Sequence, residues 1–349
     1  MTPPDPGAAA EAAAHHLRLT KPAGSLGQLE DIGVRLAAIA GVSPPPLPSP
    51  ACVAVFAADH GVLAEGVTPW PQDVTAQMVA NFCSGGAAIN VLARHAGARV
   101  LVVDVGVATP LQAAPGLLPR KVRAGTGNIA VEPAMTLEEA GAALDVGAEV
   151  AATLVAEEAR CLVTGDMGIG NTTASAAVIA AITGRRAGEV TGRGTGIDDA
   201  TFSKKVLVVD AAITRARGAG SLDGEAVAIL AAVGGLEIAA LAGFIIGGAA
   251  ARVPVIVDGV IALAGLLVAA RIAPGVVAYC FAGHRSTEPG ASAALDHLDL
   301  EPILDLGMRL GEGSGACLAL PVVEAAAKIL QEMATFDAAG VTHKTDGAP

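Results

Sequence analysis

The chain has 349 residues, of which 52% are hydrophobic but only 2% aromatic, and its formal net charge is −12. An acidic chain without basic runs interleaved with aromatic residues lacks the electrostatic character of a nucleic-acid-binding protein, which excludes that class. The five cysteines are widely spaced and form no C-x-x-C pair, which argues against a disulfide framework or a structural zinc site and favours a reducing cytoplasm.

The N-terminal segment is not typical of a secretory signal, because no basic start is followed by an apolar run. Residues 74–93 are uncharged and long enough to suggest a membrane span. Polar side chains recur along that stretch and argue against a membrane helix. We therefore expect a cytoplasmic protein that does not interact with a membrane.

Short β-branched or apolar runs alternate with longer Ala-rich stretches along the chain. The runs begin at Cys52, Arg99, Cys161, Val253 and Gly275, and the clearest helical stretches are Thr136–Ala159 and Gly259–Ile272. Strand-then-helix alternation predicts an α/β fold with a mainly parallel sheet and helices on both faces. A proline-rich segment, "GVSPPPLPSP", separates an N-terminal helical segment from the sheet region. Residues 336–349 are expected to be disordered.

Several predicted strands end at a polar side chain. These residues are Asp59, Asp104, Asp166, Asp258 and His284. Parallel strands bind ligands beyond their carboxyl ends, so the five should gather along one edge that holds the site. The alternative is that each aspartate only caps the helix or loop that follows it.

The segment Gly66–Ala93 places the only tryptophan, Trp70, between two prolines and ahead of a helix. Gln77 and Asn81 lie four residues apart, on one face of that helix. An apolar wall with a few amides is suited to a flat heterocycle. A core helix with one polar side explains the spacing equally well.

The segment "GDMGIGNTTASAA" (Gly165–Ala177) closes a predicted strand and opens a helix. Its glycines allow close approach of the backbone, and the free N–H groups at Asn171 and the two threonines after it favour an anion such as phosphate. The segment is neither the dinucleotide G-x-G-x-x-G fingerprint nor a Walker loop. A turn that merely needs glycine is the alternative.

A second glycine-rich loop, "TGRGTGIDDATFSKK" (Thr191–Lys205), ends in two lysines, although cations are scarce in this chain. One of the lysines could complete a phosphate site as a point charge. Lysines in solvent on a helix surface are the alternative.

Two further segments carry polar chemistry. "GHRSTEPG" (Gly283–Gly290) holds a histidine, a serine and a glutamate, but the absence of a G-x-S-x-G elbow argues against a hydrolase. "RLGEGSGA" (Arg309–Ala316) holds a lone carboxylate, Glu312, between two glycines, with no second acid and no metal-ligand spacing.

Together these segments resemble the nicotinate-nucleotide:5,6-dimethylbenzimidazole phosphoribosyltransferase family, which makes the α-ribazole phosphate of the cobalamin lower ligand. The resemblance runs from about Thr20 to about Leu330. It rests on seven ordered blocks: "TKPAGSLGQLE", "FAADHGV", "PWPQDVTAQMVANF", "GDMGIGNTTASAA", "TGRGTGIDD", "VDGVIALAG" and "LDLGMRLGEGSGA".

The resemblance implies a Rossmann-like domain over residues 46–299, a small helical domain from residues 1–45 and 300–335, and a homodimer. It implies that the phosphate and ribose are bound by Asp166, Gly168, Ile169, Gly170, Asn171, Gly194 and Lys205. It places the incoming base near Trp70, Gln77, Met78, Ser286 and Leu310, and makes Glu312 the catalytic general base. Two features depart from the family pattern: Asp166 replaces the usual glutamate, and Arg285 has no assigned role.

The implied activity transfers the phosphoribosyl group of nicotinate mononucleotide to 5,6-dimethylbenzimidazole with inversion, giving α-ribazole phosphate and nicotinate. The leaving pyridine nitrogen is already positive and needs no general acid, so a single base suffices to take the proton of the incoming ring. We therefore expect no cofactor and no metal. A non-catalytic phosphoribosyl-compound binder and transfer to a purine or phenolic base remain alternatives. A nucleotide-dependent oxidoreductase would need the dinucleotide glycine fingerprint, which is absent.

Overall fold

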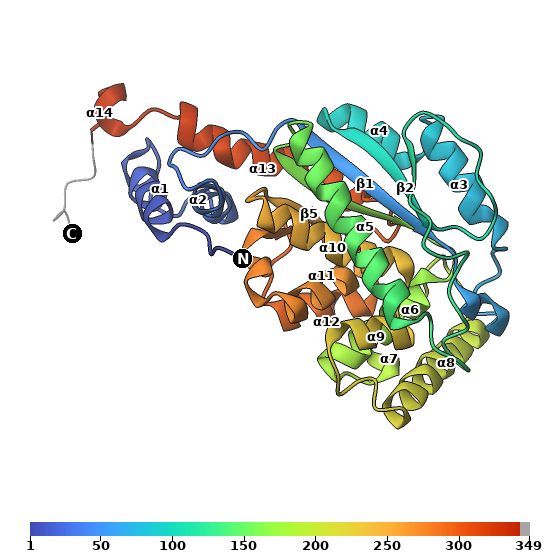
Figure 1. Cartoon of the computed structure of the whole chain (residues 1–349). Coiled ribbons are helices and arrows are strands. Elements are labelled where there is room, and N and C mark those ends of the chain that lie inside the picture. The colour runs from blue at the N-terminus through green and yellow to red at the C-terminus, as the bar shows by residue number, and fades with distance from the viewer. Residues whose placement is uncertain (343–349) are drawn as a thin grey trace.

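A six-stranded sheet forms the centre of the molecule (Figure 1). This computed structural model describes residues 1–342. The strands are β1 (Ala51–Ala58), β2 (Arg99–Gly106), β3 (Leu117–Pro119), β4 (Cys161–Met167), β5 (Val255–Val257) and β6 (Cys280–Ala282). They lie in the order β3-β2-β1-β4-β5-β6, and each is parallel to its neighbours. Doubly wound dinucleotide-binding folds have this order, so the predicted Rossmann-like α/β fold is confirmed.

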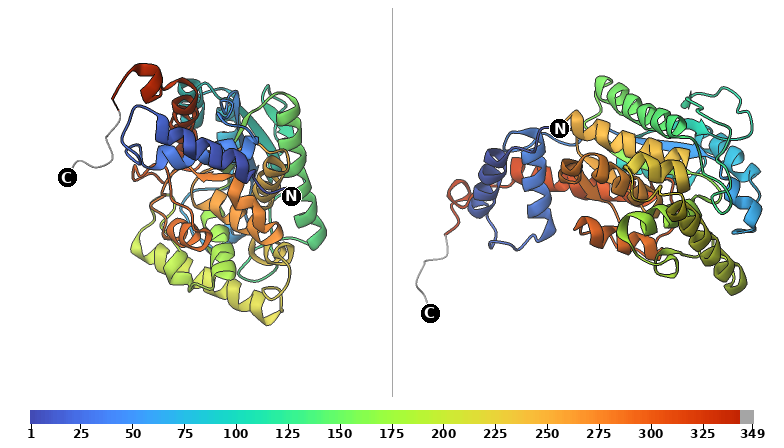
Figure 2. Two further views of the ribbon diagram at one scale, coloured as in Figure 1. Left: turned by 90° about the vertical axis from the view of Figure 1, so that its left-hand side faces the viewer. Right: turned by 60° about the horizontal axis from the view of Figure 1, so that its bottom comes forward.

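Helices cover both faces of the sheet. They are α1 (Pro6–Arg18), α2 (Gln28–Ala40), η1 (Gly61–Glu65), α3 (Asp73–Cys83), α4 (Ala88–Ala96), α5 (Leu137–Ala156), α6 (Asn171–Thr183), α7 (Ala187–Val190), α8 (Asp199–Gly218), α9 (Ala226–Val233), α10 (Leu236–Ala250), α11 (Val260–Ile272), η2 (Pro274–Tyr279), α12 (Pro289–Leu298), α13 (Ser314–Glu332) and α14 (Phe336–Ala339). On one face α10 packs against β1, β2, β4 and β5, and α5 packs on α10. On the other face α4 packs against β2, and α13 against β4 and β5 (Figure 2). Because β1 is covered on both sides, all of its residues are buried.

Two strands differ from the runs predicted by the sequence. The short edge strand β3 lies outside all of those runs. The run from Gly275 forms a strand only over its last part, because the 3₁₀ helix η2 occupies the residues before Cys280. Pro274, at the start of η2, has the fixed φ that favours a helical turn there.

Glycine lets α5 and α10 approach each other closely. A Cβ atom added at Gly147 of α5 would lie 1.8 Å from the carbonyl oxygen of Ala240, and one added at Gly243 of α10 would lie 1.9 Å from that of Leu144. No side chain fits at such distances. This contact explains how a core with few aromatic residues reaches close packing through small side chains and backbone.

The N-terminal helices α1 and α2 lie beside the last part of α13 and near α14 at one end of the molecule, away from the carboxyl edge of the sheet (Figure 1). There α1 and α2 pack on each other, and both contact α13. Leu19 forms a β-bridge with Thr335, which ties the N-terminal segment to the chain after α13. The predicted division into 1–45 with 300–335 and 46–299 remains a prediction. Within the segment expected to be disordered, α14 is helical, and residues 343–349 lie outside the described residues.

One helix in residues 1–342, α13, is long and apolar enough to cross a membrane by length and composition. More than half of its most apolar part is buried inside the molecule, where the helix packs against α2, α4, β4 and β5. A core helix has the same properties. Residues 74–93, which also suggested a span, form the two helices α3 and α4 with a break at Ser84–Ala87.

Candidate active site

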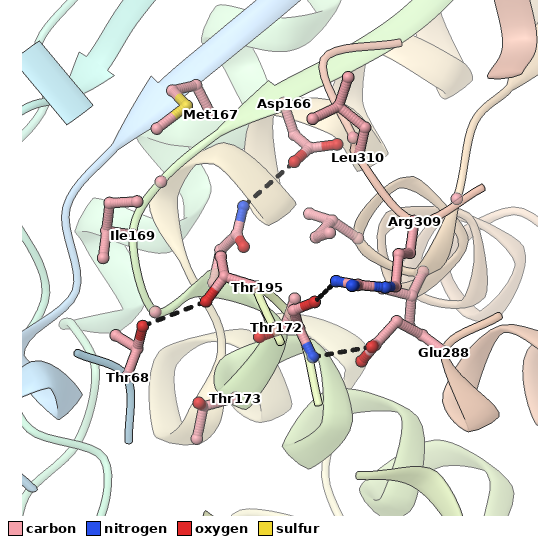
Figure 3. A pocket seen from close by; sticks show the side chains of 18 of the residues that line it. Thr68, Asp166, Met167, Ile169, Thr172, Thr173, Thr195, Glu288, Arg309 and Leu310 are labelled. Atoms are coloured by element: carbon pink, nitrogen blue, oxygen red, sulfur yellow. Dashed lines mark hydrogen bonds between the residues drawn. The ribbon is translucent and has the colours of Figure 1, made fainter. Parts of the chain in front are cut away.

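A cavity of about 390 Å³ lies beyond the carboxyl ends of β4, β5 and β6 (Figure 3). Its walls come from segments that follow these strands, from α3 and the chain before it, from the loop before α8 together with Lys205 of α8, and from the chain before α13. The lining residues are Val67, Thr68, Trp70, Val74, Met78, Asp166–Thr173, Arg193–Thr195, Ile197, Lys205, Gly259–Ile261, His284, Ser286, Glu288 and Arg309–Glu312. The cavity therefore lies at the sheet edge where the sequence predicts ligand binding.

The loop between β4 and α6 forms one wall of the cavity. A Cβ atom at Gly168 would lie 2.4 Å from the carbonyl oxygen of Ala58, so only glycine lets this loop run against β1. Gly170 has a φ of 94° and is the N-cap of α6. The first turn of α6, which carries Asn171, Thr172 and Thr173, therefore begins at the cavity wall. The backbone N–H groups of Asn171 and Thr173 donate to the carbonyl oxygens of Gly168 and Gly170 at 3.0 and 2.9 Å, so it is the positive end of the helix dipole that favours an anion there.

The second glycine loop is held by two charged side chains from distant parts of the chain. Glu288 accepts a hydrogen bond from the backbone N–H of Gly194 at 2.8 Å. Arg309 donates to the carbonyl oxygen of the same residue (Figure 3). A Cβ atom at Gly192 would lie 2.0 Å from Oε2 of Glu288, so a larger residue at this position would displace the Glu288 carboxylate. Glu288 and Arg309 were not predicted as site residues, because they lie 94 and 115 positions from Gly194 in the sequence and no local pattern connects them.

Lys205 joins the two glycine loops from α8. Its side chain is buried, and Nζ donates to Oγ1 of Thr172 at 2.8 Å and to the carbonyl oxygen of Gly192 at 3.1 Å. A lysine ammonium has three N–H donors, so one is left for a ligand. Burial lowers the pKa of Lys205 to about 8, and the nearby charge of Glu288 opposes this effect. Lys204, its neighbour in sequence, is exposed.

Glu312 lies in a turn of unusual backbone conformation. The φ angles of Gly311, Glu312 and Gly313 are 84°, 64° and 90°, so three consecutive residues are left-handed. Glycine adopts this conformation freely, whereas it costs a residue with a Cβ atom roughly 1–2 kcal/mol. The backbone of the turn is therefore strained at Glu312, and this conformation sets the direction of the Glu312 carboxylate. Backbone strain of this kind is typical of functional sites.

The Glu312 carboxylate has one bound and one free oxygen. Oε2 accepts from the backbone N–H of Ile89, in the first turn of α4, at 3.0 Å. Oε1 has no hydrogen-bond partner within residues 1–342, and the side chain lines the cavity. Burial raises the pKa of Glu312, and the charge of Asp258 raises it further, while the Ile89 hydrogen bond lowers it. The hydrogen bond to α4 thus occupies Oε2, and Oε1 is available to a ligand.

Asp166 lies beside the same turn. Its Oδ1 accepts from Nδ2 of Asn171 at 3.1 Å, whereas Oδ2 is buried without a partner in the described part of the chain (Figure 3). Burial raises the pKa of Asp166 well above its usual range, and Asp258, Glu237 and Glu312 add to the effect, against the Asn171 hydrogen bond. The neutral, protonated form of this carboxyl is therefore favoured relative to an exposed aspartate.

The residues predicted to contact the incoming base do not all reach the cavity. Trp70, Met78, Ser286 and Leu310 line it, and Trp70 and Leu310 are exposed at its mouth. Gln77 does not line it and is exposed. Adjacent residues of a helix point about 100° apart, so Met78 and Gln77 of α3 cannot both face inward.

Arg285 likewise points away from the cavity. Its guanidinium donates to Oγ of Ser292 at 3.3 Å and lies 3.8 Å from Asp305. By contrast, every residue predicted to bind the phosphate and ribose lines the cavity. Within the described part of the chain, no group of three or more His, Cys, Asp or Glu side chains is arranged to hold a metal ion.

The chain is similar in sequence and in fold to several known proteins. A family model described as "Phosphoribosyltransferase" matches residues 1–341. The nicotinate-nucleotide–dimethylbenzimidazole phosphoribosyltransferase of Salinispora tropica is 55% identical, over 98% of this chain and 97% of its own length. That of Chloroflexus aurantiacus is 54% identical, over 98% and 96%. The crystal structure of the enzyme of this name from Thermus thermophilus matches with a TM-score of 0.92 and 47% identity, over 97% of this chain and 100% of that one.

Proposed function

The chain belongs to the family of nicotinate-nucleotide–dimethylbenzimidazole phosphoribosyltransferases, and on this premise we propose how its cavity performs the transfer. Nicotinate mononucleotide binds with its phosphate between the two glycine loops. The phosphoribosyl group passes to 5,6-dimethylbenzimidazole, with inversion at the anomeric carbon. The products are α-ribazole phosphate and nicotinate.

One observation carries this proposal. A single cavity contains the free carboxylate oxygen of Glu312, the first turn of α6 and the ammonium group of Lys205. The first turn of α6 and the ammonium group of Lys205 favour a phosphate. The free oxygen of Glu312 is a base that no other group of the described residues occupies. A non-catalytic binding protein would need the loops but not the strained turn that carries Glu312.

The reaction balances with one base. The bond between the anomeric carbon and the pyridinium nitrogen breaks, and its electron pair neutralises that nitrogen, so nicotinate leaves without protonation. The unprotonated nitrogen of dimethylbenzimidazole forms the new bond to the anomeric carbon. Its other nitrogen loses a proton, which Glu312 accepts on its free oxygen. Holding both rings and the phosphate in line supplies the remaining acceleration.

The apolar side of the cavity fits the two aromatic rings. Trp70, Met78 and Leu310 offer surface for stacking or packing, and Ser286 offers a hydroxyl group.

We further infer that the protein acts as a homodimer in the cytoplasm. Five free cysteines, four of them buried, are consistent with a reducing compartment. Light scattering on the purified protein measures the oligomeric state.

The function is tested by incubating the purified protein with nicotinate mononucleotide and a panel of bases, followed by identification of the products by mass. We expect release of nicotinate and formation of α-ribazole phosphate when dimethylbenzimidazole is supplied. Binding of the nucleotide without release of nicotinate with any base would support a binding protein instead. Faster transfer to a purine or a phenolic compound would reassign the acceptor.

We expect exhaustive chelation to leave turnover unchanged. A leaving group that departs as a neutral amine gains little from a Lewis acid. Turnover is measured before and after treatment with chelator, and again after addition of divalent ions. Loss of activity that one specific ion restores would contradict this expectation.

Binding of nicotinate mononucleotide should weaken at alkaline pH. Lys205 has a pKa of about 8, so it carries its charge below pH 8 and loses it as the pH rises through that value. A phosphate favours the charged form, so kcat/KM for the nucleotide should be level between the acidic limb set by the ionisation of Glu312 and about pH 8, and should fall above pH 8 toward the lower value of the uncharged side chain. A pH series of kcat/KM measures this, and the fall should be absent in Lys205→Met. A fall of the same size in that variant would assign it to another group.

A further inference from the structure

Asp258 lies directly beneath the turn that carries Glu312. It follows the last residue of β5 and is fully buried. Its own backbone N–H donates to Oγ1 of Thr164 in β4 at 2.9 Å. Asp258 does not line the cavity, so it is not placed to touch a substrate.

The Asp258 carboxylate binds the chain on both sides of the start of α13. Oδ2 accepts from the backbone N–H of Gly313 at 3.2 Å, and Oδ1 accepts from that of Ala316 at 2.9 Å. Nε2 of His284 lies 3.4 Å from Oδ1. Gly313 is the residue after Glu312 and has a φ of 90°. The buried side chain of Asp258 therefore holds the end of the Gly311–Gly313 turn, whose backbone conformation is unfavourable by itself.

The turn is also tightly packed from the side of β4. A Cβ atom at Gly313 would lie 2.8 Å from the carbonyl oxygen of Thr164, and one at Gly165 would lie 2.6 Å from that of Glu312. The backbone of the turn thus rests on β4 and cannot move toward it. The remaining freedom is movement away from the sheet, which the two hydrogen bonds to Asp258 prevent.

We propose that Asp258 is a positioning residue of the transfer reaction, which holds the Gly311–Gly313 turn so that the free oxygen of Glu312 points at the proton of the incoming base. This inference rests on the proposed function, in which Glu312 accepts that proton. Asp258 acts through Glu312 and has no contact with the reacting atoms.

The charge of Asp258 has a second effect on the same residue. It disfavours the ionised form of Glu312, which raises the pKa of Glu312 beyond the effect of burial. A base with a higher pKa accepts a proton more readily, provided that the pH stays above that pKa. Of the other charged or titratable groups, Asp166 at the end of β4 interacts electrostatically with Glu312, His284 after β6 lies against Asp258, and α4 contributes only a backbone N–H. The remaining charged residues that line the cavity are Arg193, Lys205, Glu288 and Arg309.

Asp258→Asn tests the inference. The variant keeps the size of the side chain, but its amide group can accept from only one of the two N–H groups and directs its own N–H at the other. We expect kcat to fall by roughly ten- to a hundredfold, the effect of misplacing a catalytic group by about an ångström. The KM for nicotinate mononucleotide should change little, because the phosphate loops do not depend on Asp258.

The pH profile separates positioning from general damage. Glu312 must be ionised to accept a proton, so kcat falls as the pH drops through the pKa of Glu312. Removing the charge of Asp258 lowers that pKa, and the acidic limb of the profile should move to lower pH. A purely structural loss would leave the limb in place.

Asp104→Asn is the matched control. Asp104 lies near the end of β2, is buried, and accepts a backbone hydrogen bond from Val107 at 2.9 Å, but it does not line the cavity. Its kcat and the acidic limb of its pH profile should stay as in the wild type.

A second test combines Asp258→Asn with Glu312→Gln. If Asp258 acts through Glu312, the double variant should be no slower than Glu312→Gln alone.

The outcomes separate this inference from the proposed function. If Glu312→Gln is slow but Asp258→Asn behaves like Asp104→Asn, the inference is overturned and the proposed function stands. If Glu312→Gln keeps wild-type turnover, the proposed function itself fails.

If Asp258→Asn does not fold, Asp258→Glu replaces it as the test, because glutamate keeps the charge but displaces the carboxylate. Its kcat should then fall while the acidic limb stays in place, and wild-type kcat in that variant would contradict the inference.

Discussion

Glu312→Gln is expected to lower kcat for transfer to dimethylbenzimidazole by roughly a hundred- to ten-thousandfold, the usual contribution of a general base. Glutamine keeps the size of the side chain, and its amide oxygen can still accept from the backbone N–H of Ile89. The turn should therefore keep its conformation. Nicotinate mononucleotide should bind as before, because its phosphate site lies in the two glycine loops.

The pH dependence of the variant carries further information. Without the carboxylate, the incoming ring must lose its proton to solvent, so the activity of Glu312→Gln should rise with pH over the range where wild-type activity is level. Steady-state kinetics with both substrates, together with nucleotide binding by calorimetry, measure these quantities. Glu301→Gln, which alters an exposed carboxylate earlier in the same loop region, serves as the control and should be unchanged. Near-wild-type kcat in Glu312→Gln at neutral pH would show that the carboxylate only shapes the turn.

Lys205→Met is expected to raise the KM for nicotinate mononucleotide by roughly ten- to a hundredfold. This factor corresponds to the loss of one hydrogen bond from a charged group, worth about 1.5–3 kcal/mol. Methionine fills most of the volume of the buried lysine stem, so the protein should fold. The bonds from Nζ to Thr172 and Gly192 are lost as well, which loosens the contact between the two loops.

Two controls distinguish a phosphate contact from a structural role of Lys205. Lys204→Met removes a charge from the adjacent, exposed lysine and should leave the KM unchanged. The dephosphorylated riboside should be a poor substrate of the wild type and should lose little more in Lys205→Met. An equal loss with nucleotide and riboside would mean that Lys205 only joins the loops.

Local sequence patterns were sufficient for the α/β fold class and marked the glycine loops, whereas the roles of the candidate site residues came from the resemblance to the family. The alternation of short apolar runs with Ala-rich stretches follows from the different side-chain periods of strands and helices, so it could be recognised without coordinates. The glycine loops after β4 and before α8 were visible because close backbone approach and positive φ require glycine, as at Gly170. Glu312 was identifiable as a lone carboxylate between glycines.

The tertiary structure alone decided what holds these loops in place. Glu288 and Gly194 are 94 positions apart, and Asp258 and Gly313 are 55 apart, so no periodicity along the chain connects them. The same applies to Gln77, whose position outside the cavity depends on how α3 is rotated against the sheet. Sequence determines local conformation through φ preferences and side-chain period. Which charged groups meet across the cavity depends on the order β3-β2-β1-β4-β5-β6, which places the ends of β4, β5 and β6 side by side.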